Sequence, residues 1–325
     1  MQIWLWIGFL GFVVLMLALD LGVFNKNSHV VKVKEALGWT AFWVVLAMIF
    51  NLLVYYMYEN HLFDIGLQVG HQLSGSQAAL QFFTGYVIEK SLSMDNIFVI
   101  AMIFSYFKVP SIYQHRVLFW GILGALFMRG AMILGGVALI EEFTWMTYVF
   151  GGILILTAVK MLVTSHDNLE PDKNILVKMI RHFYPVSENF ESGKFFTKIN
   201  NKIAITPLFL VLLVIESTDV LFAIDSIPAI FAITTDPFII FTSNVFAILG
   251  LRSLYFALAA MMDKFRFLKI SLVFVLAFVG SKMILVHHYQ IPTLFSLAVI
   301  IGILSVGIIA SIYASKKDSA KLDNH

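Results

Sequence analysis

Long hydrophobic runs alternate with short polar connections along the whole chain. A membrane-crossing helix needs about 20 mostly apolar residues, and nine runs in this chain reach that length. They cover approximately residues 3–24, 36–57, 77–105, 118–140, 145–165, 205–233, 238–262, 269–287 and 292–315. The pattern therefore predicts an all-α polytopic membrane protein with nine transmembrane helices, forming a single transmembrane domain over residues 1–325.

Basic residues occupy only every second connection between these runs. The connections after spans 1, 3, 5 and 7 and the C-terminal tail all carry lysine or arginine. The connections around 58–76, 141–144, 234–237 and 288–291 carry none and hold acids instead: Glu59, Asp64, Glu141, Glu142 and Asp236. Because cytoplasmic loops are enriched in basic residues, the sequence predicts an outside N-terminus and a cytoplasmic C-terminus.

The composition narrows the range of function classes. Hydrophobic residues make up 60% of the chain and charged residues 13%, against about 25% charged in soluble domains. This balance excludes a soluble enzyme, a disordered chain and a nucleic-acid-binding domain, and a net charge of +2 indicates no polyanionic partner. With no cysteine, the chain has no disulfides, iron–sulfur ligands or thiolate chemistry. We expect the lipid bilayer as a partner, no cofactor and no enzymatic activity.

The segment 166–204 is the only sizeable extramembrane piece and is predicted to be a cytoplasmic loop. Residues 175–183, ILVKMIRHF, mix apolar and basic positions at helical spacing, as in a helix on a membrane surface. Residues 194–205 alternate at period two around Asn200 and Asn201, which indicates a small hairpin. The alternative for both, and the favoured one, is a solvated connector with a basic face.

Eleven charged residues lie inside the predicted spans. Each costs about 2.5–3.5 kcal/mol at the bilayer centre on insertion scales, so they must face one another or a wet cavity. A charged residue inside the membrane is by default a functional hypothesis. The eleven are Asp20, Glu89, Lys90, Asp95, Arg129, Lys160, Glu216, Asp219, Asp225, Arg252 and Lys282.

The order of these charges repeats. An acid, an arginine and a lysine recur as Asp95, Arg129 and Lys160, and then as Asp219, Arg252 and Lys282, with spacings that agree within one residue. The pattern predicts two three-helix units, 84–165 and 205–287, built from spans 3–5 and 6–8. Three spans is an odd number, so the second unit is inverted, as in many secondary transporters whose site lies at the repeat interface.

The acids are placed to form one site. Glu216 and Asp219 are three apart and share a helix face, while Asp95 and Asp219 lie near the middle of spans 3 and 6. Where these spans cross, the three carboxylates are expected to meet, with other oxygen donors along the path. The predicted metal-binding residues are Glu89, Asp95, Asn96, Glu216, Asp219 and Asp225. Oxygen ligands suit magnesium, calcium or manganese.

Two further features bear on this site. Pro228 removes a backbone donor inside span 6 and frees the carbonyl of Ile224 as a further ligand; the alternative is a plain kink. The intramembrane cations are expected to balance the acids when the metal is absent, or alternatively to form structural ion pairs. The predicted charge partners are Asp20, Arg129, Lys160, Arg252 and Lys282.

Three long strings carry a family resemblance: TGYVIEKSLSMDNIFV at 84–99, TPLFLVLLVIESTDVLFAIDSIPAIFAIT at 206–234 and DPFIIFTSNVFAILGLRSLYF at 236–256. They resemble the TerC family of integral membrane proteins, and most of all its Alx-type manganese-exporting branch. The resemblance implies export of Mn²⁺ across the bacterial inner membrane. It places the family's acidic motif on the six predicted metal residues, and ALDLGVF at 18–24 makes Asp20 a weaker candidate.

The sequence and the resemblance together predict a proton-coupled secondary transporter that exports Mn²⁺ by alternating access. Two alternatives remain open from the residues. One is a membrane scaffold or assembly factor whose charge pairs only hold its helices together. The other is a transporter for another cation, such as Ca²⁺ or H⁺.

Overall fold

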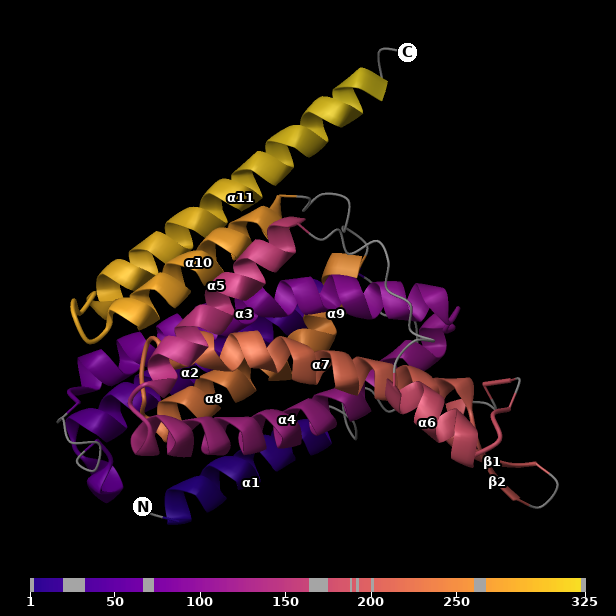
Figure 1. Ribbon diagram of the computed structural model, residues 1–325. Coiled ribbons are helices and arrows are strands. Elements are labelled where there is room, and N and C mark those ends of the chain that lie inside the picture. The colour runs from indigo at the N-terminus through magenta and orange to yellow at the C-terminus, as the bar shows by residue number, and fades with distance from the viewer. Residues whose placement is uncertain are drawn as a thin grey trace.

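The chain folds into an all-helical bundle with one small hairpin at its edge (Figure 1). The structure is a computed structural model that describes residues 3–19, 33–66, 73–163, 175–187, 189–190, 193–199, 202–259 and 267–322. The helices are α1 (Ile3–Leu19), α2 (Val33–Glu59), α3 (Gly75–Tyr106), α4 (Ser111–Glu142), α5 (Met146–Val163), α6 (Ile175–Phe183), α7 (Pro207–Phe231), α8 (Pro237–Leu249), α9 (Leu251–Ala259), α10 (Leu268–Leu285) and α11 (Thr293–Leu322), with a short 3₁₀ turn η2 (Leu62–Asp64). The strands are β1 (Phe196–Ile199) and β2 (Lys202–Ile205).

Most of the long helices could cross a membrane. Within the described residues, six are long and apolar enough: α2, α4, α5, α7, α10 and α11; the bent pair α8–α9 adds a seventh if it is one span. Helix α1 is apolar but has only 17 residues, and α3 carries Glu89, Lys90 and Asp95, which lower its hydropathy. The prediction of an all-α polytopic membrane protein is confirmed, whereas the count of nine spans and their orientation stay predictions.

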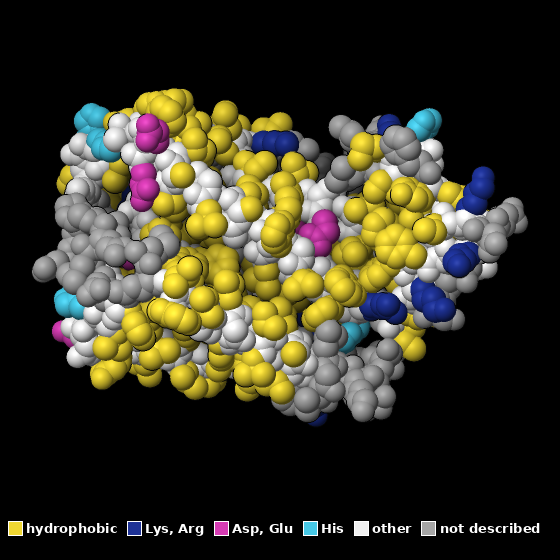
Figure 2. All heavy atoms as spheres, turned by 90° about the horizontal axis from the view of Figure 1, so that it is seen from below, with side chains coloured by type: hydrophobic (Ala, Val, Ile, Leu, Met, Phe, Trp, Pro, Cys, Tyr) yellow, Lys and Arg dark blue, Asp and Glu magenta, His cyan; other side chains and the backbone are white. Residues whose placement is uncertain are grey.

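The surface of the bundle is apolar where a soluble protein would be polar. Large hydrophobic side chains such as Phe127, Leu156 and Val306 are more than two-thirds exposed, and hydrophobic atoms cover much of the face in Figure 2. Charged side chains such as Glu89, Arg129 and Lys282 are buried instead. This inverted distribution is favourable only when the exposed face is solvated by lipid rather than water.

Local sequence explains where several helices begin. Ser74 and the side chain of Gln77 form a reciprocal capping box at the start of α3. The Asp236 side chain accepts from the backbone N–H groups of Phe238 and Ile239 and caps α8. Pro207 and Pro237 are the first residues of α7 and α8, a position where the missing N–H costs nothing. These signals fix where α3, α7 and α8 begin, and α3 and α7 are the helices that carry the described intramembrane acids.

The two predicted three-helix units interlock rather than standing side by side. Helix α3 packs extensively on α8, α4 on α7, and α5 on α10. The first helix of each unit thus lies against the second helix of the other, and the two third helices lie against each other. A two-fold relation between the units requires this reciprocity, although the boundaries and inversion of the repeat remain predictions.

Span 7 was predicted as one continuous run, 238–262, but the structure breaks it at Gly250 with a bend of 42° between α8 and α9. The Lys90 ammonium lies at the break and donates to the Ala247 carbonyl at 3.1 Å. A Cβ on Gly250 would lie 2.8 Å from that Nζ and 3.2 Å from Trp43 Cβ. The close approach of Lys90 and α2 therefore leaves little room for a side chain at this point. By contrast, α7 continues through Pro228 to Phe231.

The segment between the two units folds as its sequence indicates. Residues 175–183 form α6, and β1 pairs antiparallel with β2, with Phe196 opposite Ile205 and Ile199 opposite Lys202. The predicted helix and hairpin are confirmed as secondary structure. They project together from one end of the bundle (Figure 1).

Candidate functional site

A buried ion network joins three helices at the centre of the bundle. Arg129 on α4 is only 2% exposed. Its Nη1 contacts the Glu89 carboxylate of α3, while Nη2 and Nε donate to Asp219 Oδ1 and Oδ2 of α7 at 2.9 and 3.1 Å. The second contact is a bidentate fork, the strongest arginine–carboxylate geometry. The single positive charge of Arg129 therefore balances only one of the two negative charges that it contacts. Its contacts fix α3, α4 and α7 relative to one another.

Neutral side chains complete this network. Asn244 on α8 donates to Glu89 Oε2 at 3.1 Å, and its own Oδ1 lies 3.5 Å from Arg129 Nη1. Ser226 Oγ lies 3.4 Å from the same nitrogen, and Ser93 Oγ lies 3.4 Å from Glu89 Oε1. Sequence reasoning missed Asn244, and the only signal for it is an amide inside the apolar run FIIFTSNVFAIL.

A cavity of about 450 Å³ with several polar groups on a mostly apolar wall lies among α3, α5, α7 and α10. Asp95 and Asn96 line it from α3, Asp225 from α7, and Lys160 from α5. Thr157 Oγ1 donates to Asp225 Oδ1 at 2.7 Å. The remaining polar lining residues are Thr218 and Ser226, and the others are apolar: Leu92, Val99, Ile153, Met161, Leu221, Phe222, Ile224, Leu272 and Leu276.

A second, smaller space lies next to this cavity and to the ion network. It has a volume of about 30 Å³, about the space of one water molecule. Asp219 and Arg252 line it, and it shares Asn96, Thr218 and Phe222 with the larger cavity. Asn96 and Thr218 thus stand between the Asp95–Asp225 cavity and the Asp219 carboxylate.

Glu216 lies one helical turn before Asp219 on α7 and packs against α4. A Cβ on Gly124 would overlap the Glu216 carboxyl group, so the absence of a side chain at Gly124 provides the space for this acid. The close approach fixes Glu216 on the face of α7 that packs on α4. It does not line the larger cavity with Asp95.

The structure distributes the predicted metal residues over three settings. Arg129 holds Glu89 and Asp219. The cavity wall carries Asp95, Asn96 and Asp225, and Glu216 of α7 packs against α4. In the parts of the chain that the structure describes, no three Asp, Glu, His or Cys side chains are grouped closely enough to hold a metal ion. The meeting of Asp95, Glu216 and Asp219 is therefore not seen in this conformation, and the site stays a prediction.

The predicted charge partners are also placed. Arg129 contacts two acids, Lys160 and Arg252 line the two spaces, and Lys282 is buried on α10. Asp20 lies outside the described residues. Arg129, Arg252 and Lys282 are thus buried in the bundle, whereas Lys160 is exposed at the edge of the cavity.

Comparison with known proteins identifies relatives along nearly the whole chain. The family model described as "Integral membrane protein TerC family" matches residues 74–319. A membrane protein of Myxococcus xanthus is 50% identical over 96% of this chain and 93% of its own length. No solved structure matches the chain.

Two further relatives are named membrane-bound redox modulator Alx. The protein of Salmonella typhi is 43% identical over 98% of this chain and 97% of its own. That of Escherichia coli K12 is 42% identical over 92% and 91%, respectively. The matched region includes every described charge of the network and the cavity.

Proposed function

Because the chain belongs to the TerC family of integral membrane proteins, we propose that it is a secondary transporter of the bacterial inner membrane that exports Mn²⁺ from the cytoplasm. The observation that carries the proposal is the cavity of about 450 Å³ between apolar helices, with Asp95, Asn96 and Asp225 on its wall. Oxygen donors in such a cavity suit a hard divalent cation such as Mn²⁺. A membrane protein has little reason to bury carboxylates unless they contact a cation.

We assign the two groups of acids successive roles. Asp95, Asn96 and Asp225 receive the cation in the cavity, and Asn96 and Thr218 separate it from Asp219. In this conformation the Arg129 guanidinium occupies the place of a cation beside Asp219 and Glu89. The transported ion competes with it when the helices rearrange and bring Glu216 and Asp219 into reach. Alternating access then consists of rocking one three-helix unit against the other.

Proton coupling follows from the same chemistry. Once the metal leaves, bare carboxylates inside the bundle are unfavourable, and taking up protons from outside neutralises them. The acids then return to the cytoplasmic side at lower free energy. We therefore propose that Mn²⁺ leaves in exchange for protons.

The test is Mn²⁺ flux in proteoliposomes, with and without an imposed pH gradient. Asp95→Asn and Asp219→Asn are expected to abolish flux while the protein still inserts and folds. Glu142→Gln, an exposed acid at the end of α4, is the matched control and is expected to keep full flux. Unchanged flux in both aspartate variants would overturn the assignment.

A scaffold is the second candidate, and the Arg129 network favours it because buried ion pairs can serve only to hold helices. A scaffold would bind no metal after purification, and its function would survive a charge swap between Arg129 and Asp219.

The relatives' name, redox modulator, suggests an indirect redox effect, since this chain has no cysteine. Competition among Mn²⁺, Ca²⁺ and Mg²⁺ in the flux assay separates manganese from another cation.

A further inference from the structure

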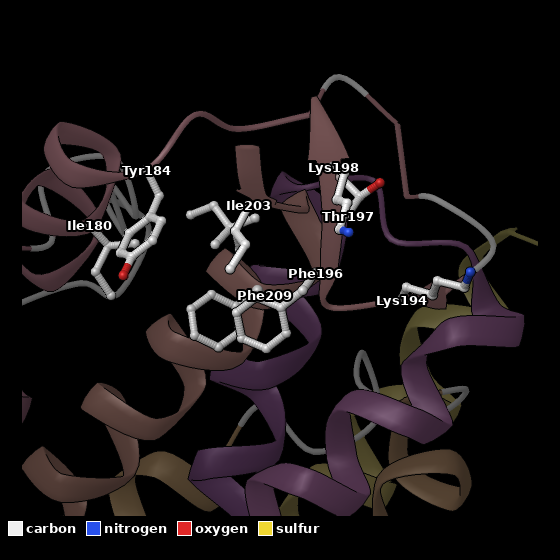
Figure 3. A pocket seen from close by; sticks show the side chains of 9 residues that line it. Ile180, Tyr184, Lys194, Phe196, Thr197, Lys198, Ile203 and Phe209 are labelled. Atoms are coloured by element: carbon white, nitrogen blue, oxygen red, sulfur yellow. The ribbon is translucent and has the colours of Figure 1, made fainter. Parts of the chain in front are cut away.

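A groove of about 740 Å³ lies at the end of the bundle, away from the charged cavity (Figure 3). Its walls come from α6, the β1–β2 hairpin and the first turn of α7. Figure 3 shows the side chains of these three elements around the open space. The lining residues are Ile180, Tyr184, Lys194, Phe196, Thr197, Lys198, Ile203, Ile205 and Phe209.

The floor of the groove is apolar and exposed. Phe196 is 55% exposed and Ile203 is 59% exposed. The Phe196 ring packs on the Phe209 ring of α7, with centroids 4.8 Å apart, and Tyr184 borders the same space. A contiguous exposed apolar surface of this kind indicates a binding site for an apolar group.

The rim of the groove is basic. Lys194 and Lys198 line it, and none of the nine lining residues is acidic. Lys178, Arg181 and Lys202 are exposed on the same elements. Lys and Arg side chains accordingly gather at this end of the molecule in Figure 2. The occupant that this surface fits is both apolar and negatively charged.

The groove is built into the fold rather than left open between loose segments. Thr206 Oγ1 donates to the Lys194 carbonyl at 2.7 Å. Ile205 N donates to the Pro185 carbonyl at 3.0 Å, and Ser187 N donates to the Ile205 carbonyl at 2.8 Å. These bonds tie the hairpin and the segment after α6 to the start of α7.

The place of the groove decides the class of its occupant. Its floor residue Phe209 is in the first turn of α7, which is long and apolar enough to cross the membrane. The groove therefore lies at the membrane boundary, on the side that the basic connections predict to be cytoplasmic. Anionic lipids of that leaflet attract basic residues next to a membrane span.

We propose that this groove binds one anionic phospholipid of the adjacent leaflet. An acyl chain lies against Phe196, Ile203 and Phe209, and the headgroup phosphate contacts the Lys194 and Lys198 ammonium groups. A zwitterionic phospholipid presents the same chains but no net negative charge, so it binds more weakly. This inference does not depend on the transported ion.

The experiment is native mass spectrometry of the full chain, equilibrated with equal amounts of phosphatidylglycerol and phosphatidylcholine. The wild type is expected to retain the anionic lipid in preference. Each lysine near the surface contributes enough that the double variant Lys194→Gln/Lys198→Gln should lower the ratio by about tenfold or more. The matched control, Lys34→Gln/Lys108→Gln, removes two exposed lysines from other parts of the chain and should leave the ratio unchanged.

A second pair of variants tests the apolar floor. Phe196→Ser/Ile203→Ser keeps both lysines and changes only exposed side chains, and its thermal unfolding checks that it folds. It is expected to lose retention of the anionic lipid. Equal retention of both lipids by the wild type, an equal loss in the control, or unchanged retention in the serine variant would overturn the proposal. Full displacement of the lipid by glycerol phosphate would also overturn it, because it indicates an anion site without a lipid chain. A change of oligomeric state without bound lipid would overturn it as well, because it indicates that a second copy of the chain occupies the groove.

Discussion

At the scale of single residues, Arg129 is the side chain on which the buried network depends. Arg129→Gln removes the cation that contacts both Glu89 and Asp219, and breaking a buried pair from one side costs about 3–5 kcal/mol. We expect a clear fall in the midpoint of thermal unfolding in detergent. Arg129→Lys keeps the charge but loses the bidentate fork, so its unfolding midpoint should lie between those of the wild type and Arg129→Gln.

Arg116→Gln supplies the control for this prediction. Arg116 is on the same helix, is exposed and stacks over the Phe195 ring at 5.2 Å. Its replacement removes an equal charge without burying an unpaired acid, so the midpoint should change little. If Arg129→Gln and Arg116→Gln unfold at the same temperature, the network does not stabilise the bundle.

Gly124 tests the position of Glu216. Alanine in place of helical glycine normally stabilises by up to about 1 kcal/mol, but at Gly124 the new Cβ overlaps the Glu216 carboxyl group. We expect Gly124→Ala to gain no stability, to displace Glu216 and to lower Mn²⁺ flux in proteoliposomes. Gly135→Ala on the same helix, where nothing lies within 4 Å, should gain stability and keep its flux. Equal behaviour of the two variants would contradict the packing of Glu216 on α4.

At the scale of elements, the break between α8 and α9 depends on Gly250 and Lys90. In Gly250→Ala the Cβ would lie 2.8 Å from Lys90 Nζ, so the ammonium must leave the Ala247 carbonyl. A buried acceptor that loses its donor costs about 1–3 kcal/mol, and circular dichroism on heating should show that loss. Gly302→Ala on α11, with open space around it, is the control. A Gly250 variant as stable as the control would mean that Lys90 does not hold this break.

The same break shows how far sequence can predict these elements. Apolar runs of sufficient length predict helices reliably because the membrane allows few alternatives, and each described long helix falls on a predicted span. A single glycine in such a run carries no such information; only the approach of Lys90 from α3 and Trp43 from α2 shows that position 250 is crowded. Nor does the chain reveal that Asn244 donates to Glu89, 155 residues away. The spacing of the acids predicted that they face inward, but their division among Arg129, the cavity and α4 depends on tertiary packing.

At the scale of the whole molecule, the predicted inversion of the two units can be tested directly, because the chain has no cysteine of its own. If the two units are inverted, the residues that follow α3 and α7 lie on opposite sides of the membrane. Lys108 and Thr235 are exposed at these two points, and each cysteine introduced there is the only thiol in the chain. A membrane-impermeant maleimide should label Thr235→Cys in intact cells, or in spheroplasts if an outer membrane blocks access, and Lys108→Cys only after the inner membrane is permeabilised. Reversed labelling would keep the inversion and reverse the predicted orientation, whereas labelling of both from one side would refute the inversion. A rocking mechanism about a two-fold axis would then lose its basis, because the two units could not present the same site to opposite sides in turn.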